Sequence, residues 1–547
     1  MHNRIEKIEL SADATYDVLV VGAGLAGTTA ALAAAQAGAH VALASSGPTF
    51  SGSSFFGGTW GLGLVGPLSD DPAGEKDLVD AICSVGRGVA VRPLAETLVS
   101  GVAGAVRELE RRGVELARAE RADERDFIPC FDWGHRAWHG LGRESYRKAT
   151  GRALGEAGVA LLPGCDLVDL AREDGPGAGR VCGAALFDRA AGRFRVVAAG
   201  AVVLATGGFG GLFERTLTMP DVTGTAQAVA LAAGARLVNV EFMQIMPGLV
   251  EPVRNVVFNE RTFKYARMEG FDAPDAAVLL DARSEHGPFS ASLPDHVVDL
   301  ALVAAGECGA AVSYELPEAL PEFMQTYFSW FSDAFGRSPA EGIRILPYAH
   351  AANGGILVDE RARSGVDGLF AAGEATGGMH GADRIGGLAS ANALAFGEIA
   401  GREAAAWAGA HPNGGASWEL RTCGCGNAGD VLRELRRLMG ERCLVVRTAE
   451  GLAEAARGIE ALSVRLDEAE GPCKRYDEVA RVLAAHQALT SASALVAAMA
   501  ARTESRGAHY RADFPEADPA QARPNVVTLE GGELRVRALA GWPELDA

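Results

Sequence analysis

Closely spaced glycines form the first group of residues that could support chemistry. The sequence GAGLAG at residues 22–27 is a GxGxxG motif that follows an apolar run and precedes an alanine-rich run. Glycines at this spacing allow a tight turn and let a pyrophosphate approach the start of the following helix, whose positive end favours anions. The same motif can also be a tight turn that binds nothing. Its place between a predicted strand and a predicted helix favours a dinucleotide site.

The second strand of such a unit commonly ends at a carboxylate that binds ribose. Here Ser45 and Ser46 stand at that place. Hydroxyl groups can also bind ribose or phosphate, although more weakly than a carboxylate does. We therefore expect both serines to contact the cofactor.

A second glycine-rich segment, residues 365–401, contains a carboxylate directly after an apolar run. Glu374 follows the sequence GLFAAG, and a glycine-rich approach to a helix comes after it. Two such glycine-rich segments, far apart in the chain, suit FAD better than NAD because a flavin dinucleotide extends across a sheet and needs contacts at both ends. The alternative is that these glycines only turn the chain.

Arg384 and His350 are the side chains best suited to bind a substrate. Arg384 lies among glycines, which let a ligand come close, and a planar guanidinium can hold a carboxylate by two parallel charge-assisted hydrogen bonds. His350 is followed shortly by the sequence NGG, which again suggests close approach of a ligand. The alternatives are a surface arginine and a buried histidine whose nitrogens are satisfied by the protein.

Three predicted strands end at glycines and could bring these residues together. A βαβ unit is predicted over residues 17–45, and further strands are predicted at residues 201–208 and 368–373. In an open parallel sheet, ligands collect outside the carboxyl ends of the strands. Three such ends could therefore converge on one long cofactor.

The rest of the chain divides into two further regions. Residues 241–347 mix polar and aromatic stretches such as PEFMQTYFSWFSDAF, and we interpret them as an inserted domain. From about residue 416 onward, helical periodicity predicts a helical bundle followed by an extended tail. The segment AHPNGGASWELRTCGCGNAGD, at residues 410–430, is predicted to be a linker.

Composition indicates a large acidic globular protein. The chain has 547 residues, of which 22% are charged and 48% hydrophobic, and its formal net charge is −19. These values exclude disordered, collagen-like and disulfide-scaffold classes, and the length predicts about three structural units. No basic run is present to displace counterions from nucleic acid, so no nucleic-acid partner is expected.

The cysteines and the N-terminus bear on localisation. The nine cysteines are scattered, and Cys423 and Cys425 lack the spacing of a zinc ribbon or a ferredoxin cluster. Residues 1–17 carry charges where a signal peptide has an apolar region, and no window holds eighteen apolar residues. We therefore expect a reduced, cytoplasmic protein without a membrane span.

These motifs together resemble the flavoprotein family of succinate dehydrogenase, fumarate reductase and L-aspartate oxidase. The resemblance extends over nearly the whole chain. It is carried by GAGLAG at 22–27, ATGG at 205–208, EFMQ at 241–244, HAANGGI at 350–356, GLFAAGEATGGMHGADRIGG at 368–387 and RTESRGAHYRADFP at 502–515. The last of these segments is typical of members that carry a C-terminal helical domain.

The resemblance implies an α/β fold: a Rossmann-like FAD-binding domain interrupted by a mobile α+β capping domain, plus a C-terminal helical domain. The implied boundaries are 1–240 and 348–412, 241–347, and 416–547. Substrate would lie at the junction beside the flavin, with His350 and Arg384 binding a carboxylate. The predicted FAD contacts are Gly22, Gly24, Leu25, Ala26, Gly27, Ser45, Ser46, Ser53, Gly57, Gly58, Ala205, Thr206, Gly207, Gly373, Glu374, Arg384, Leu388, Ala389 and Ser390.

Two departures from the family pattern concern the flavin and one carboxylate pocket. The family's covalent flavin histidine would fall near Ser51, where no histidine is present, so we predict noncovalent FAD. The family's Gln-x-His-Pro segment reads Gln-Ile-Met-Pro at residues 244–247, so Met246 replaces an imidazole with a soft apolar side chain.

A third departure concerns the proton donor, which in the family's reductases is an arginine of the capping domain. The corresponding stretch offers no arginine, only Ser292, Asp295 and His296. Nearby substitutes are Arg261, Arg267, Arg283, Glu260 and Tyr265. The segment NERTFKY lies closest to the family's substrate-binding Thr-Glu pair, so Glu260 and Arg261 are favoured, and His296 stays open.

Residues 127–140 gather aromatic and histidine side chains. They could line a hydrophobic substrate pocket or cover the flavin, although an ordinary aromatic cluster is the simpler interpretation. His135 and His139 have a spacing compatible with a metal, but no third ligand accompanies them, so no metal is expected.

The predicted function is hydride transfer between flavin N5 and a carbon next to a carboxylate or carbonyl, on a small-molecule substrate other than fumarate. Replacement of the family's imidazole by Met246 favours a substrate that has one carboxylate or carbonyl and a bulkier apolar remainder. Three alternatives stay open: an L-aspartate oxidase-like amine oxidation, a flavoprotein subunit with an iron–sulfur electron-transfer partner, and a flavin-binding module without activity.

Overall fold

A βαβ unit begins the ordered chain, as predicted for residues 17–45. Strand β2 (Ala14–Val21) leads through the glycine turn into helix α1 (Leu25–Gln36), and β3 (Val41–Ser45) follows. The computed structural model describes residues 7–69, 71–121, 123–124, 129–173, 179–412, 416–421, 427–468 and 473–542. The pair Cys423 and Cys425 and part of the segment 127–140 lie outside these residues.

The central sheet brings the three glycine-terminated strands together. Strand β10 pairs in parallel with β2 on one side and with β17 on the other, so that Leu204 lies opposite both Val21 and Ala371. The predicted convergence of the three strand ends is therefore confirmed. The other strands of the sheet are added in the order β7-β3-β2-β10-β9-β8. Their bounds are β7 Ala160–Pro163, β8 Cys165–Arg172, β9 Val181–Asp188, β10 Arg193–Leu204 and β17 Leu369–Ala371.

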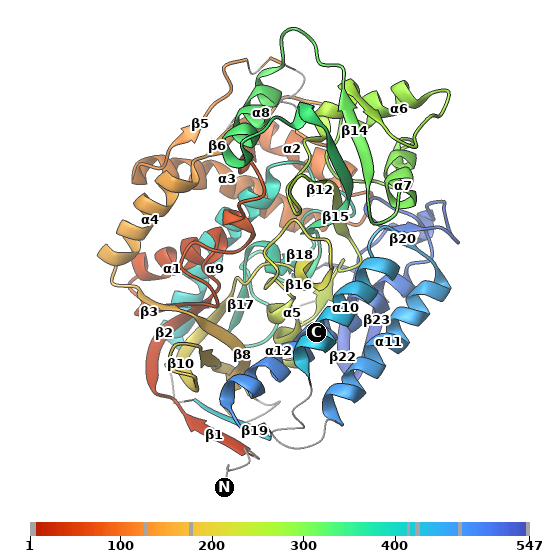
Figure 1. The fold of residues 1–547 in the computed structure, drawn as a ribbon. Helices are drawn as coiled ribbons and strands as arrows, with labels where there is room; N and C mark the ends of the chain where they lie inside the picture. The colour runs from red at the N-terminus through yellow and green to blue at the C-terminus, as the bar shows by residue number, and fades with distance from the viewer. Residues whose placement is uncertain are drawn as a thin grey trace.

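Two helices pack against each other beside this sheet (Figure 1). Helix α9 (Leu388–Ala410) crosses α1 so closely that a Cβ on Gly401 would lie 2.2 Å from the Ala30 carbonyl oxygen. Alanine and glycine on both helices permit this contact. Around them lie α2 Pro72–Val85, α3 Arg92–Arg112, α4 Arg143–Glu156, and the small sheet of β4 Gly63–Gly66, β5 Leu116–Ala117 and β6 Ala137–Leu141.

A four-stranded antiparallel sheet carries the aromatic region. Its strand order is β12-β15-β14-β13, and it has a hydrophobic cluster of its own that includes Phe258, Phe263, Tyr327 and Phe331. The aromatic sequence PEFMQTYFSWFSDAF forms helix α8. The elements of this region are β12 Met243–Glu251, β13 Ala266–Met268, α6 Ala276–Arg283, α7 His296–Ala304, β14 Ala310–Tyr314, α8 Glu322–Phe335 and β15 Ile343–Ala352.

Three helices dominate the C-terminal region, as the periodicity predicts (Figure 1). They are α10 Ala428–Arg442, α11 Ala449–Asp467 and α12 Tyr476–Ala501, and the pair β20 Val446–Arg447 and β21 Tyr510–Arg511 accompanies them. Within the described residues, α12 alone has the length and apolar character of a membrane span. Most of its apolar stretch is buried inside the protein, which is typical of a core helix.

The predicted linker and tail both contain strands. Within the linker, β19 (Ser417–Arg421) pairs antiparallel with β1 (Lys7–Ser11), and the Trp418 side chain of β19 is buried. The tail forms a hairpin, whose first strand pairs with β11. This sheet consists of β11 Leu237–Val238, β16 Gly355–Leu357, β18 Thr376–Gly377, β22 Asn525–Glu530 and β23 Glu533–Ala538. A description as linker and extended tail is therefore incomplete.

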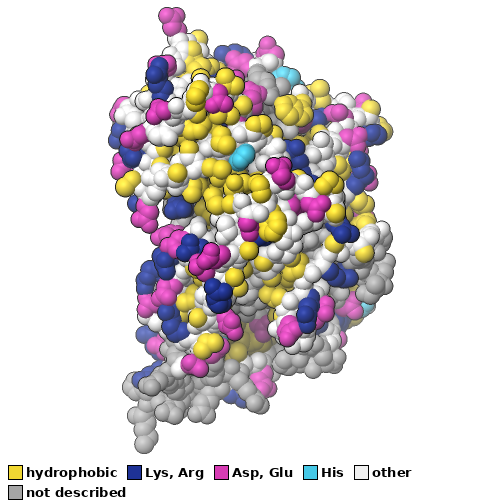
Figure 2. All heavy atoms as spheres, turned by 90° about the vertical axis from the view of Figure 1, so that its right-hand side faces the viewer, with side chains coloured by type: hydrophobic (Ala, Val, Ile, Leu, Met, Phe, Trp, Pro, Cys, Tyr) yellow, Lys and Arg dark blue, Asp and Glu magenta, His cyan; other side chains and the backbone are white. Residues whose placement is uncertain are grey.

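Acidic and basic side chains are interspersed on the face of the molecule seen in Figure 2. That face shows no broad basic patch of the kind that binds nucleic acid. Hydrophobic side chains lie between the charges there, as on most protein surfaces.

Candidate active site

A cavity of about 1050 Å³ lies outside the carboxyl ends of the central strands. This volume is at the upper end of the range for small-molecule sites and gives room for a long cofactor. Most of the predicted site residues line it. They are Gly22, Gly24, Leu25, Ala26, Ser45, Ser46, Ser53, Ala205, Thr206, Gly207, Glu260, His350, Glu374, Arg384, Ala389 and Ser390.

Six predicted residues lie beside the cavity rather than on its lining: Gly27, Gly57, Gly58, Gly373, Leu388 and Arg261. A Cβ on Gly27 would lie 1.7 Å from the Gly22 carbonyl oxygen, and one on Gly373 would lie 2.6 Å from the Ala26 Cβ. These two glycines allow the surrounding backbone to pack. Contact of the six residues with a cofactor or a substrate stays a prediction.

The start of α1 is suited to an anion. Its N-cap, Gly24, makes no side-chain capping bond, and its first turn carries no acidic residue. Ser54 accepts a 3.4 Å hydrogen bond from the Leu25 N–H, and the buried Ser53 Oγ has no hydrogen-bond partner. Uncapped helix N–H groups beside serine hydroxyls match the donors that a pyrophosphate requires.

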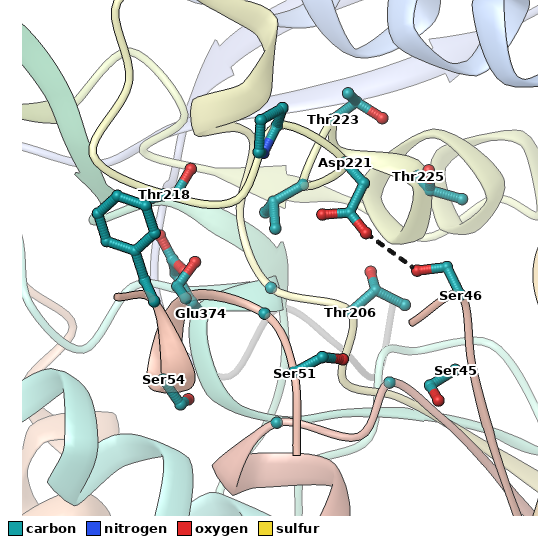
Figure 3. A pocket seen from close by; sticks show the side chains of 18 of the residues that line it. Ser45, Ser46, Ser51, Ser54, Thr206, Thr218, Asp221, Thr223, Thr225 and Glu374 are labelled. Atoms are coloured by element: carbon teal, nitrogen blue, oxygen red, sulfur yellow. Dashed lines mark hydrogen bonds between the residues drawn. The ribbon is translucent and has the colours of Figure 1, made fainter. Parts of the chain in front are cut away.

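Glu374 lies in the wall of the cavity at the end of β17. Its Oε1 accepts a 2.9 Å hydrogen bond from the Ala352 N–H, and burial raises the pKa of its carboxyl. A Cβ on Gly208 would lie 2.7 Å from that oxygen, so glycine at this position makes room for the carboxylate. Glu374 and Thr218 lie at one side of the close-up in Figure 3, and Ser45 and Ser46 lie at the other.

Arg384 and His350 both line the cavity and lie close enough for the arginine charge to act on the imidazole. Arg384 is 7% exposed, and its Nε donates a 2.9 Å hydrogen bond to Gln244 Oε1. Burial lowers the pKa of Arg384 to about 10, so the side chain is still a cation at neutral pH. Burial, with the nearby Arg384 charge, lowers the pKa of His350 to about 3. A fixed cation beside a neutral imidazole can bind and polarise a carboxylate or carbonyl oxygen.

Glu260 also lines the cavity. It begins the short helix η4 (Glu260–Tyr265), and its Oε1 accepts a 3.3 Å hydrogen bond from the Cys130 thiol. Its Oε2 is buried and has no hydrogen-bond partner. Burial, together with the charge of Glu260, raises the pKa of Cys130 to about 12, so the sulfur stays protonated. Glu260, a residue of the cavity lining, therefore has one carboxyl oxygen without a hydrogen-bond partner.

The other candidate proton donors have structural partners. Arg261 donates hydrogen bonds of 3.2 Å to the carbonyl oxygens of Ser284 and Glu285. Five of the remaining candidates are also engaged: Arg283 with Asp299, Arg267 with Glu315, Asp295 with His286, Ser292 with Gly507, and His296 with the Leu293 carbonyl. The sixth, Tyr265, is not part of the cavity lining. Glu260 alone of the favoured pair lies on the cavity lining.

An apolar wall stands near these polar groups. Met246 is 7% exposed and packs in one cluster with Leu217 and Val257, and Phe56 and Trp60 lie against it. All five residues line the cavity. The Trp60 ring meets Tyr327 of α8 edge-on, with their centroids 4.9 Å apart. The position expected to carry an imidazole is thus part of a hydrophobic surface.

Sequence reasoning missed a polar group beside Ser46. Asp221, Thr223 and Thr225 line the cavity on the side of Ser46, and Thr218 lines it on the side of Glu374 (Figure 3). They belong to the segment TLTMPDVTGT, which ends at the first residue of helix α5 (Thr225–Ala232). Its run of threonines and one aspartate was the available signal. Four polar residues of the C-terminal region also line the cavity: Arg436, Asp477, Arg481 and Gln487.

A metal centre is not evident in the described part of the chain. No group of three or more His, Cys, Asp or Glu side chains there is arranged to hold an ion. His139 lies on β6, and burial lowers the pKa of its imidazole.

Family comparisons agree with this geometry. Residues 17–389 match the family model described as the FAD binding domain, and residues 432–536 match the one described as the fumarate reductase flavoprotein C-terminus. An L-aspartate oxidase of Caulobacter vibrioides is 32% identical, over 95% of this chain and 98% of the relative. One from Mycobacterium leprae is 30% identical, over 96% and 97%.

Solved structures share the fold. An E. coli quinol fumarate reductase chain superimposes with a TM-score of 0.78 at 21% identity, covering 96% of both chains. A chain of Mycobacterium smegmatis Sdh1 gives 0.75 at 24% identity, covering 96% of this chain and 94% of that one. The predicted mixed α/β fold and FAD as the cofactor are therefore confirmed. The chain belongs to the family of FAD-dependent oxidoreductases that includes L-aspartate oxidase and the flavoproteins of succinate dehydrogenase and fumarate reductase.

Proposed function

We propose that this oxidoreductase transfers hydride between FAD and a carbon next to a carboxylate or carbonyl, on a substrate with an apolar remainder rather than on fumarate. The observation that carries the proposal is Met246 in an apolar wall beside Arg384 and His350. Arg384 can bind one anionic or carbonyl group of the substrate. A second carboxylate against Met246 would lose its hydration without gaining a partner, which is costly.

The fit of the cavity to FAD rests on its donors. The uncapped start of α1 and the free Ser53 hydroxyl suit the pyrophosphate. The start of α9, where Ala389 and Ser390 line the cavity, has no side-chain cap either and offers a positive helix end to the flavin. The segment around Ser51 contains no histidine, so the bond to FAD is proposed to be noncovalent.

The same proposal keeps the predicted domains. Residues 1–240 and 348–412 would bind FAD, residues 241–347 would cap the substrate, and residues 416–547 would form the C-terminal domain. Support for the cap comes from its antiparallel sheet and its separate hydrophobic cluster. A cytoplasmic location and an electron-transfer partner also belong to the proposal.

When bound, FAD supplies hydride transfer at its N5 atom. Arg384 and His350 hold and polarise the carboxylate or carbonyl oxygen, so that the β-carbon becomes electrophilic. Glu260 takes up a proton from solvent and passes it from its carboxyl group to the α-carbon, so that this proton and the hydride together saturate the double bond. The apolar wall excludes water from the reacting carbons. In the reverse direction, Glu260 accepts the proton.

A substrate panel tests this assignment. Acid denaturation should first release yellow flavin into the supernatant. Reduced holoprotein is then mixed anaerobically with fumarate, with an alkyl- or aryl-substituted monocarboxylic enoate, or with an enone, and flavin reoxidation is followed. We expect the apolar enoate or the enone to react faster than fumarate. In the Met246→His variant, kcat/KM for fumarate relative to the enoate should rise roughly 10-fold, because a new hydrogen bond reaches a second carboxylate.

Met219→His is the matched control, since Met219 does not line the cavity and its substitution should leave this ratio unchanged. Rapid oxidation by fumarate in the unmodified protein would contradict the proposed substrate class. The second candidate function is an aspartate oxidase-like amine oxidation, favoured by the two L-aspartate oxidase relatives. Reduction of the oxidised flavin by L-aspartate, in the absence of any enoate reaction, would select it.

Glu260→Gln tests the proton donor. Glutamine keeps the shape and the contact with Cys130 but cannot give up a proton to carbon. We expect kcat to fall about 100-fold or more, while KM changes little, because general acid catalysis contributes factors of this size. Glu269→Gln, an exposed change in the same region, should leave kcat unchanged. A large rise in KM that accompanies the fall in kcat would instead assign Glu260 to substrate binding.

A further inference from the structure

Cys130 joins Glu260 to the segment that carries Arg384. Its thiol donates a 3.3 Å hydrogen bond to the Oε1 atom of Glu260. Its carbonyl oxygen accepts a 3.2 Å hydrogen bond from the N–H of Gly386, two residues after Arg384. One residue therefore contacts the proposed proton donor through its side chain and the arginine segment through its backbone.

A tight turn holds Cys130 in this place. The Asp132 N–H donates a 3.0 Å hydrogen bond to the Pro129 carbonyl oxygen, and Phe131 within the turn has a φ of +66°. The Phe131 ring stacks on His286, with the ring centroids 5.0 Å apart. This aromatic contact fixes the turn against the proposed cap, so the thiol has a defined position relative to Glu260.

Gly287 gives the thiol room and also orients it. A Cβ on Gly287 would lie 3.0 Å from the Cys130 Sγ and 3.1 Å from the Glu260 Oε1, so a side chain there would crowd both atoms. The Gly287 backbone donates a hydrogen bond to the sulfur. Because the sulfur already accepts this bond, its S–H is left to be donated to Glu260.

The direction of the thiol's hydrogen bond decides which oxygen of Glu260 can carry a proton. Burial, with the charge of Glu260, raises the pKa of Cys130 to about 12, so the thiol is the donor and Oε1 is the acceptor at neutral pH. Glu260 is 4% exposed, and its Oε2 has no hydrogen-bond partner. A proton on Oε1 would face the proton of the thiol, so protonation of Glu260 is favoured at Oε2.

We propose that Cys130 is a positioning residue for proton transfer, because its thiol holds Glu260 Oε1 and directs the transferable proton to Oε2. This inference rests on the proposed role of Glu260 as the proton donor. The proton that solvent supplies to Glu260 leaves from Oε2 to the substrate carbon. The thiol keeps its own proton, and no bond to sulfur forms or breaks.

Substitution of the thiol in the holoprotein tests the proposal. Cys130→Ala should lower kcat roughly 10-fold for the fastest substrate of the panel, with little change in KM, which is the size expected for one lost hydrogen bond. Cys130→Ser keeps a hydroxyl donor and should restore kcat to within about 3-fold of the unmodified protein. In the Glu260→Gln background, which has no proton to transfer, Cys130→Ala should cause no further loss.

Cys308→Ala is the matched control, because Cys308 is an exposed cysteine of the same region that does not line the cavity. Its kcat should equal that of the unmodified protein. Flavin content and thermal melting check that each variant is folded. Cys130→Val fills the space of the thiol without a donor, and it carries the same comparison if the alanine variant loses its flavin.

Three results would overturn the positioning role: an unchanged kcat in Cys130→Ala, equal losses in the alanine and serine variants, or an additive loss in the Glu260→Gln background. The two proposals fail in distinguishable ways. If Glu260→Gln leaves kcat unchanged, the proposed proton donor fails, and the positioning role fails with it. If Glu260→Gln lowers kcat and Cys130→Ala does not, the positioning role alone fails.

Discussion

Arg384→Lys is expected to lower kcat/KM about 100-fold or more for whichever substrate of the panel reacts fastest. Lysine keeps the positive charge but loses the planar fork, so it cannot hold a carboxylate through two parallel hydrogen bonds. It also loses the 2.9 Å bond from Nε to Gln244 that fixes the side chain in place. The loss should appear mainly in KM if Arg384 acts chiefly by binding the substrate, and mainly in kcat if it acts chiefly by polarising the substrate.

The measurement is anaerobic reoxidation of the reduced flavin, with flavin content determined from the visible spectrum. Arg267→Lys is the matched control, because Arg267 is an exposed arginine of the same region that pairs with Glu315 on the surface. Its kinetics should equal those of the unmodified protein. Full activity in Arg384→Lys would show that the substrate does not depend on the guanidinium, and the site would have to be reassigned.

Arg502→Met is expected to lower the free energy of unfolding by about 3–5 kcal/mol, the range for removing one partner of a buried ion pair. Arg502 is 1% exposed and donates hydrogen bonds of 2.8 Å to Glu241 and 2.9 Å to Glu504. It also donates to the carbonyl oxygens of Gln521 and Arg523. After substitution, Arg506 still pairs with Glu504, but the fully buried Glu241 loses its cationic partner.

Thermal and denaturant unfolding of the holoprotein measure this effect. Arg465→Met is the control, because Arg465 forms an exposed pair with Glu434 that contributes less than about 1 kcal/mol. We expect the midpoint of Arg502→Met to fall well below that of the control. Equal midpoints for the two variants would mean that the buried cluster adds no more stability than a surface ion pair.

Features that depend on local backbone chemistry could be predicted from the sequence. The glycine motif at residues 22–27 requires a tight turn, and Gly22 indeed has a φ of +109°, with the Ala205 carbonyl oxygen where a side chain would stand. Periodicity likewise predicted the C-terminal helices. Such features are decided within one or two turns of chain, so neighbouring residues carry the whole signal.

The candidate site was predictable only in part. Arg384, His350 and Glu374 were recognisable because glycines and strand ends surround them, and all three line the cavity. Arg261 and Glu260 are adjacent in sequence, yet Glu260 faces the cavity and Arg261 binds the loop after α6. Packing of the short helix η4 decides this difference, and no periodicity over six residues can reveal it.

By itself, the sequence determined the strand–turn–helix unit, the carboxyl-edge position of the site and the loss of an imidazole at Met246. Only the tertiary structure decided that Asp221 meets Ser46 across 175 positions of chain, and that the tail pairs with β11. These contacts join segments that lie far apart in the chain, and the local sequence of neither segment indicates its partner. They follow from the way the sheet, the loop before α5 and the C-terminal hairpin pack together.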